Sequence, residues 1–155
     1  MTFLSKKGIV TLAAVGLMFA SFCLAYQAGS IPASRLINPE ELAKILQSSQ
    51  NEKPIVIQVG FRTLYEQAHI PGTEYVGPAS GSSGLQELRK LVESLPRTRF
   101  IVIYCGCCPW SHCPNLKPAA DALQAMGFKN FKVLYIANNF GADWVDKGYP
   151  VTKGQ

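Results

Sequence analysis

The sequence predicts an α/β fold, a small parallel sheet flanked by helices. Strand-like runs alternate with helical segments along the chain, and these runs are continuously apolar. Strands that are buried on both faces have this composition, which is typical of parallel sheets covered by helices. A chain of 155 residues that is 48% hydrophobic can form one domain with a buried core. The net charge of +5 comes without a basic stripe, so the sequence gives no support for binding to nucleic acid.

The N-terminal segment has the composition of an export signal. Two lysines precede an uncharged apolar run over residues 8–25, as in a secretory signal. Three interpretations of residues 1–25 remain open: a cleaved signal peptide, a membrane anchor or tether through residues 8–25, and a lipid anchor at Cys23. All three predict an exported domain, periplasmic or otherwise extracytoplasmic. We expect residues 26–37 to form a linker and residues 38–155 to form the domain.

The first half of the domain contains two clear helices and one strand. A helix is predicted to begin after Asn38, a suitable N-cap, because a proline and two glutamates follow it. The apolar run PIVIQV over 54–59 predicts a buried strand, and a short helix is expected over 63–68. A loop rich in glycine and proline follows over 69–81. The next helix, over 83–95, has its leucines on one face and ends at a proline.

The second half repeats the alternation. The run RFIVIY over 99–104 is the clearest buried strand. A helix over 116–126 ends at a glycine, and the run FKVLYI over 131–136 predicts a third strand. A last short helix is expected over 141–147.

Four cysteines lie within nine residues, directly after the strand over 99–104: Cys105, Cys107, Cys108 and Cys113. The disulfides of exported domains usually link distant segments of the chain. These four cysteines are too close together in the sequence to do so. A local redox, sulfur-transfer or metal function is therefore expected. Ligands of open α/β sheets bind beyond the carboxyl ends of the strands, and the N–H groups at a helix start favour a negative charge there. Because the thiolate is the reactive form of cysteine, Cys105 is the candidate nucleophile.

Four segments resemble, in the right order, the rhodanese-like family: EQAHIPGTEYVG, IVIYC, AADALQAMGFKNFKVLYI and DWVDKGYPV. Together they cover about residues 36–151. The resemblance implies a rhodanese-like fold and a sulfurtransferase or persulfide carrier of the thiosulfate type. Such a protein moves a sulfane sulfur through a persulfide on Cys105. It takes the sulfur from a small donor, such as thiosulfate or a persulfide, and passes it to a thiol acceptor without an organic cofactor.

The resemblance also implies a cradle for the sulfur or for an anion, built by the loop after Cys105. Its candidate residues are Gly106, Trp110, Ser111, His112 and Lys117. The chain departs from the family pattern at Gln58, where an acidic residue is usual, and at Gly60, where arginine is common. Arg62 is close enough in the sequence to replace that arginine. The loop is also about five residues longer than usual.

The extra cysteines leave three chemistries open. In the first, Cys107, Cys108 or Cys113 resolves the persulfide on Cys105 as a disulfide, and the C-x-x-C spacing of Cys105 and Cys108 suits a reversible dithiol. In the second, the cysteines are oxidised in pairs and stiffen the loop. In the third, the four cysteines and His112 bind zinc or copper. The alternatives to sulfur transfer are therefore a non-catalytic module that binds a soft metal or a partner, and a thiol–disulfide oxidoreductase.

Overall fold

The computed structural model describes residues 30–49 and 52–154, and the predicted export segment lies outside them. The chain forms a five-stranded sheet with the order β1-β5-β4-β2-β3, in which every pairing is parallel. The strands are β1 (Leu36–Ile37), β2 (Ile55–Gln58), β3 (Glu74–Tyr75), β4 (Ile101–Tyr104) and β5 (Phe131–Leu134). In the part of the chain that the structure describes, no helix has the length and apolar character needed to cross a bilayer.

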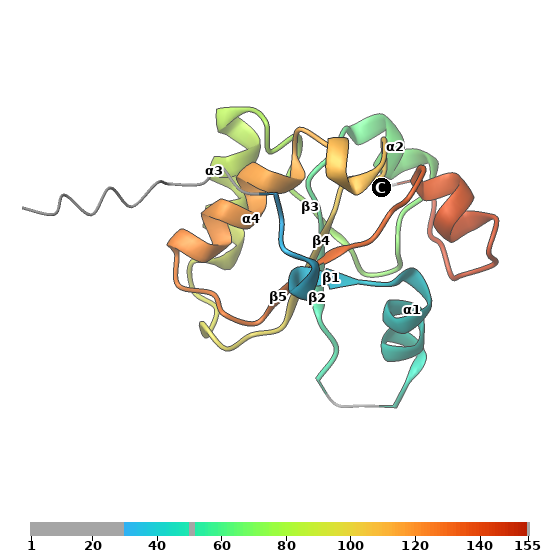
Figure 1. Cartoon of the computed structure of the whole chain (residues 1–155), viewed down its shortest axis with the longest axis horizontal. Coiled ribbons are helices and arrows are strands. Elements are labelled where there is room, and N and C mark those ends of the chain that lie inside the picture. Colours follow the sequence, from blue (N-terminus) through green and yellow to red (C-terminus); the bar gives the residue numbers. More distant parts are fainter. Residues whose placement is uncertain (1–29, 50–51, 155) are drawn as a thin grey trace, which may run out of the picture.

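Helices cover both faces of this sheet, which confirms the predicted fold class (Figure 1). Helices α3 and α4 lie side by side against one face, and α1 lies against the opposite face. The helices are α1 (Pro39–Gln47), α2 (Arg62–Gln67), α3 (Ser82–Val92) and α4 (Leu116–Ala125). Three short turns complete the fold: 3₁₀ turns over Ala33–Arg35 and Trp110–His112, and a π-helical turn over Gly141–Val145.

The central strand β4 joins the two halves of the core. Its side chains alternate between the faces of the sheet, as the two-residue period of a strand requires. Ile101, Ile103 and Cys105 pack into the cluster under α3 and α4, while Val102 and Tyr104 pack into the cluster under α1. All five side chains are buried. The continuous apolar run in the sequence therefore reflects burial on both faces.

The structure differs from the sequence-based expectation at both edges of the sheet. Leu36–Ile37, expected in the linker over 26–37, pair with β5, and Glu74–Tyr75, expected in a loop, pair with β2. Each edge strand has two residues, too few to show a periodic pattern. Asn38 does occupy the N-cap of α1, but its side chain makes no capping hydrogen bond.

A close contact at the start of α3 gives a test of the fold. A Cβ at Gly84 would clash with the Pro78 carbonyl oxygen, a backbone atom that cannot move aside without shifting the chain. The clash should cost about 1–3 kcal/mol, and alanine should recover about 1 kcal/mol of this through its higher helix propensity. We therefore expect Gly84→Ala to lower the free energy of unfolding. Urea denaturation measures the change. Exposed Ser83 in the same turn is the control, and Ser83→Ala should leave stability unchanged or slightly higher. Equal stability of the two variants would contradict the close contact between Gly84 and Pro78.

Candidate active site around Cys105

Cys105 directly follows β4 at the centre of the sheet, and only 1% of its surface is exposed. The Gln58 side chain at the end of β2 donates from Nε2 to the Cys105 carbonyl oxygen at 3.3 Å. Gln58 Oε1 has no hydrogen-bond partner among the described residues. A Cβ at Gly60 would lie 2.7 Å from the Cys105 carbonyl oxygen and 2.9 Å from its Sγ. Because the backbone approaches the cysteine this closely, the site has no room for a side chain at position 60.

A buried asparagine donates to the Cys105 sulfur. Asn115, which precedes α4 and has no exposed surface, donates from Nδ2 to Cys105 Sγ at 3.2 Å. Its Oδ1 accepts a hydrogen bond from the Ser80 N–H at 2.9 Å. Because an N–H group can only donate, that bond requires the amide oxygen to face Ser80 and the NH₂ group to face the sulfur. Sequence reasoning missed Asn115, since an asparagine just before a predicted helix indicates only a cap.

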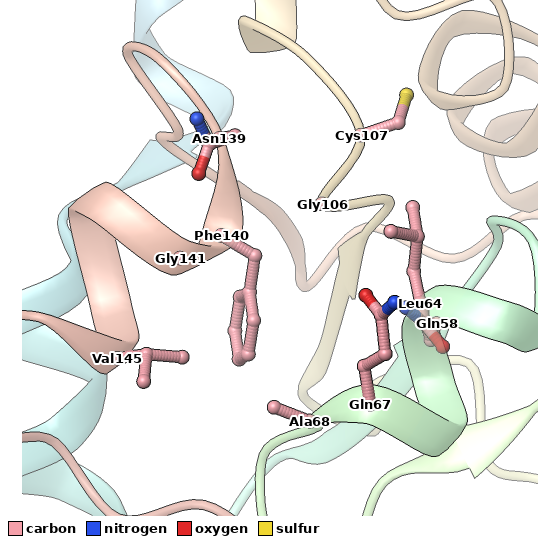
Figure 2. A pocket seen from close by; sticks show the side chains of 10 residues that line it. All are labelled: Gln58, Leu64, Gln67, Ala68, Gly106, Cys107, Asn139, Phe140, Gly141 and Val145. Carbon is pink, nitrogen blue, oxygen red and sulfur yellow. The ribbon is translucent and has the colours of Figure 1, made fainter.

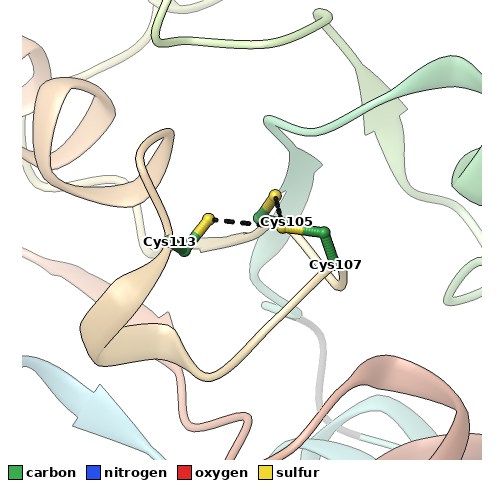
Figure 3. A group of neighbouring side chains, drawn as sticks. All are labelled: Cys105, Cys107 and Cys113. Carbon is green, nitrogen blue, oxygen red and sulfur yellow. Dashed lines mark hydrogen bonds between the residues drawn. The ribbon is translucent and has the colours of Figure 1, made fainter.

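Three of the four loop cysteines converge (Figure 3). Cys107 Sγ lies 3.4 Å from Cys105 Sγ and 4.0 Å from Cys113 Sγ, and all three sulfurs lie within 4.8 Å of one another. Cys108 Sγ lies 2.8 Å from Cys107 Sγ, on the outside of this group. All four residues are free thiols in the structure. The sulfur neighbours of Cys105 are therefore Cys107 and Cys113, and not the Cys108 of the predicted C-x-x-C pair.

These neighbours make Cys105 the acidic thiol of the group. The Cys113 thiol, which donates toward the Cys105 sulfur, contributes most to lowering the pKa of Cys105 to about 6. Burial opposes this change, and the Asn115 amide, the Cys107 N–H and the Cys107 thiol add to it. Burial is the main cause that raises the pKa of Cys107 to about 12, with Cys108 and Cys105 adding to it. The pKa of Cys113 also rises, mainly because of its hydrogen bond with Cys105. At neutral pH the group thus holds a thiolate at Cys105.

The structure narrows the predicted cradle of loop amides. The Trp110 N–H donates to the Ile136 carbonyl at 2.8 Å, and the His112 N–H donates to the Pro109 carbonyl at 3.0 Å. These two amides are therefore not available to a sulfur or an anion on Cys105. The Cys107 N–H is the loop amide that favours the thiolate.

The candidate anion-binding residues line two separate pockets. Trp110, Ser111 and Lys117 line a small pocket of about 90 Å³ with Cys113. Lys117 Nζ is paired there with Asp121 at 2.6 Å, which offsets its charge. Gly106, by contrast, lines a different pocket.

That second pocket, of about 340 Å³, opens beside the start of the loop (Figure 2). Gln58, Gln67 and Phe140 contribute to its wall. Gly106 has a φ of +91° at its edge, and its carbonyl oxygen accepts the Phe140 N–H at 3.1 Å. Figure 2 shows the Cys107 sulfur pointing away from these side chains. Gly106 and Cys107 are among the residues that line the pocket, so it borders the reactive loop.

Two other predicted residues take structural positions. His112 Nδ1 lies 3.0 Å from the hydroxyl of its exposed neighbour Ser111, and His112 is not among the three residues whose ligand atoms converge. Arg62 lies over the Tyr75 ring at 4.7 Å and pairs with Glu66 at 3.7 Å. Its guanidinium is therefore engaged by side chains of α2 and β3, and these contacts do not direct it to the Cys105 site.

Comparison with known proteins gives matches at the level of structure. No family model and no curated protein matches the chain. The rhodanese-like domain of Alr3790 from Anabaena superposes with a TM-score of 0.56 at 20% identity, covering 77% of this chain and 79% of that one. A rhodanese-like domain protein from Staphylococcus aureus gives 0.52 at 16% identity, covering 78% and 99%. The single-domain sulfurtransferase RDL2 from Saccharomyces cerevisiae gives 0.54 at 13% identity, covering 77% and 95%.

A five-stranded parallel sheet with helices on both faces and a buried cysteine after its central strand defines an α/β protein with a candidate cysteine site. The superpositions specify the fold further. The chain has the rhodanese-like fold. The resemblance inferred from the sequence segments is confirmed at that level.

The hydrogen bond from Asn115 should affect the pKa at which Cys105 titrates. Thiolate absorbance near 240 nm should rise with a midpoint of about 6, the pKa of Cys105, and Cys105→Ser should remove this transition. A hydrogen bond to a charged group is worth about 1.5–3 kcal/mol, so Asn115→Ala should move the midpoint to roughly 7–8.

The control is Asn130→Ala, which removes a surface amide that donates to the Thr98 carbonyl oxygen. This variant should titrate like the unmodified chain. An unchanged midpoint in Asn115→Ala would show that the amide does not stabilise the thiolate.

Proposed function

We propose that the protein is a sulfurtransferase or persulfide carrier in which Cys105 holds a sulfane sulfur. The observation that carries this proposal is the Cys105 sulfur itself, which follows the central strand and accepts the Asn115 amide hydrogen bond at 3.2 Å. A thiolate is the nucleophilic form of cysteine, and the pKa of Cys105 is lowered to about 6. The nucleophile is therefore present at neutral pH without a separate base.

The loading step needs only the donor. With thiosulfate, the Cys105 thiolate attacks the outer sulfur, a new S–S bond forms, and the bond to the sulfite group breaks. Sulfite leaves with the electron pair, so no oxidant or reductant takes part. With a small persulfide as donor, the leaving group is the donor thiolate.

The structure favours testing both donors. The small pocket beside Cys113 suits a small molecule, but the charge of Lys117 is already offset by Asp121. A dianion such as thiosulfate therefore finds less positive charge than the sequence suggested. A persulfide donor depends less on that charge.

Release of the sulfur follows from the same pKa differences. An acceptor thiolate attacks the outer sulfur of the persulfide, and Cys105 leaves as a thiolate. A thiol of low pKa is the better leaving group, so the lowered pKa of Cys105 favours this step as well.

Cys107 is placed to resolve the persulfide inside the protein. Its Sγ lies 3.4 Å from Cys105 Sγ. After losing its proton, Cys107 would attack that inner sulfur, form a disulfide and expel hydrosulfide. Cys108 would have to exchange through Cys107, its sulfur neighbour at 2.8 Å.

Intact mass of the full chain tests the proposal. After reduction and removal of the reductant, incubation with thiosulfate or glutathione persulfide should add one sulfur atom. Cys105→Ser should abolish the gain, because that variant has no thiolate at the end of β4. Cys108→Ser is the matched control and should keep the gain.

Two results would contradict this assignment. Sulfur gained by Cys105→Ser would place the nucleophile elsewhere. A loss of mass corresponding to a disulfide, with no sulfur gained from either donor and no hydrosulfide released, would instead support a thiol–disulfide oxidoreductase.

A further inference from the structure

The spacing of three sulfurs suggests a second kind of ligand for the loop. Three atoms that bind one metal at about 2.3 Å in a trigonal plane stand about 4.0 Å apart. The sulfurs of Cys105, Cys107 and Cys113 are separated by 3.4 Å and 4.0 Å along two sides and by no more than 4.8 Å along the third. Adjustments of less than about 1 Å on each side would bring the three sulfurs to metal-binding distance.

The spacing does not match oxidised cysteines. A disulfide holds its sulfurs about 2.05 Å apart, much less than the 3.4 Å and 4.0 Å observed here. The three residues also belong to different parts of one loop: Cys105 directly follows a strand, Cys107 lies in the bend after it, and Cys113 follows a 3₁₀ turn. That turn is attached to the end of the sheet by the hydrogen bond from Trp110 N–H to Ile136. The fold therefore holds Cys113 in position for the group.

We propose that Cys105, Cys107 and Cys113 form a three-thiolate site for a soft monovalent cation, Cu(I). Soft thiolate ligands favour both Cu(I) and zinc, so the number of ligands distinguishes the two metals. Zinc in structural sites takes four ligands, and the converging group among the described residues supplies three. Cys108 and His112, which the sequence offered as further ligands, lie outside that group.

The surroundings suit a buried metal–thiolate centre. Cys105 and Cys113 are buried, while Cys107 is partly exposed and gives a path of entry. The Asn115 NH₂ group donates to the Cys105 sulfur, as second-shell donors do for metal ligands. On binding, each ligand that is still a thiol releases its proton to solvent, and no electron is transferred because copper arrives as Cu(I).

Cu(I) and sulfane sulfur would compete for the same atom, Cys105 Sγ. A metal-bound Cys105 cannot attack a sulfur donor, so Cu(I) is expected to block persulfide formation. The binding itself does not depend on the proposed sulfur transfer, because it can be measured with no sulfur donor present.

The test is an anaerobic titration of the reduced full chain with Cu(I) against the coloured chelator bicinchoninate. We expect one Cu(I) per chain, with an X-ray absorption spectrum that shows three sulfur neighbours. Cys105→Ser, Cys107→Ser and Cys113→Ser should each weaken binding by about 100-fold or more, beyond the usual cost of losing a second-shell partner. Cys108→Ser is the matched control, because it removes a neighbouring thiol outside the group, and it should bind like the unmodified chain.

Several outcomes would overturn the site. These are failure of the chain to hold Cu(I) against the chelator, a loss in Cys108→Ser as large as in Cys107→Ser, and zinc displacing stoichiometric Cu(I). Circular dichroism of each serine variant separates a lost ligand from a lost fold. A chain that binds Cu(I) but gains no sulfur would leave this site standing and remove the proposed function alone.

Discussion

The candidate site depends on one buried hydrogen bond, from the Asn115 side-chain amide to the Cys105 sulfur. A buried amide must satisfy both its oxygen and its nitrogen, because unpaired polar groups are costly inside a protein. Ser80 N–H occupies the oxygen, so the nitrogen is left for the sulfur. The loop before α3, the start of α4 and the end of β4 are thereby joined at one point. A thiolate at Cys105 is the partner that makes best use of this donor.

Two further thiols lie close to the Cys105 sulfur. Cys107 and Cys113 lie close enough to donate to the Cys105 sulfur. That hydrogen bond is the main cause that raises the pKa of Cys113, whereas burial is the main cause that raises the pKa of Cys107. One acidic thiol among less acidic ones is a useful arrangement for sulfur chemistry. Cys105, the acidic member, can act as nucleophile and as leaving group, while Cys107 and Cys113 remain protonated and donate hydrogen bonds to it. The same three sulfurs stand at the spacing of a trigonal metal site, so the two proposed chemistries share one geometry.

Much of the fold could be predicted from the sequence, because its cause is local. Burial on both faces makes β4 continuously apolar and leaves only Gln58 in β2 and Lys132 in β5 as polar residues. Amphipathic periodicity marks α3 and α4. The two-residue strands β1 and β3 carry no such pattern, and they exist only because a neighbouring strand offers hydrogen-bond partners. The position of Cys105 after β4 was predictable for the same reason as the strand itself. The role of Asn115 was not, because its partners are 35 residues away in the case of Ser80 and 10 residues away in the case of Cys105.

The sequence by itself determined the fold class, the central strand and the cysteine that ends it, since all three depend on residue order and apolar periodicity. The tertiary structure decided which thiols meet. It brought Cys113 rather than Cys108 into the group with Cys105 and Cys107, because the 3₁₀ turn bends the loop back toward the sheet. It also directed two loop amides to protein carbonyls and paired Lys117 with Asp121. Spacing along a chain does not specify such choices, because they depend on how a loop of several residues folds back in three dimensions.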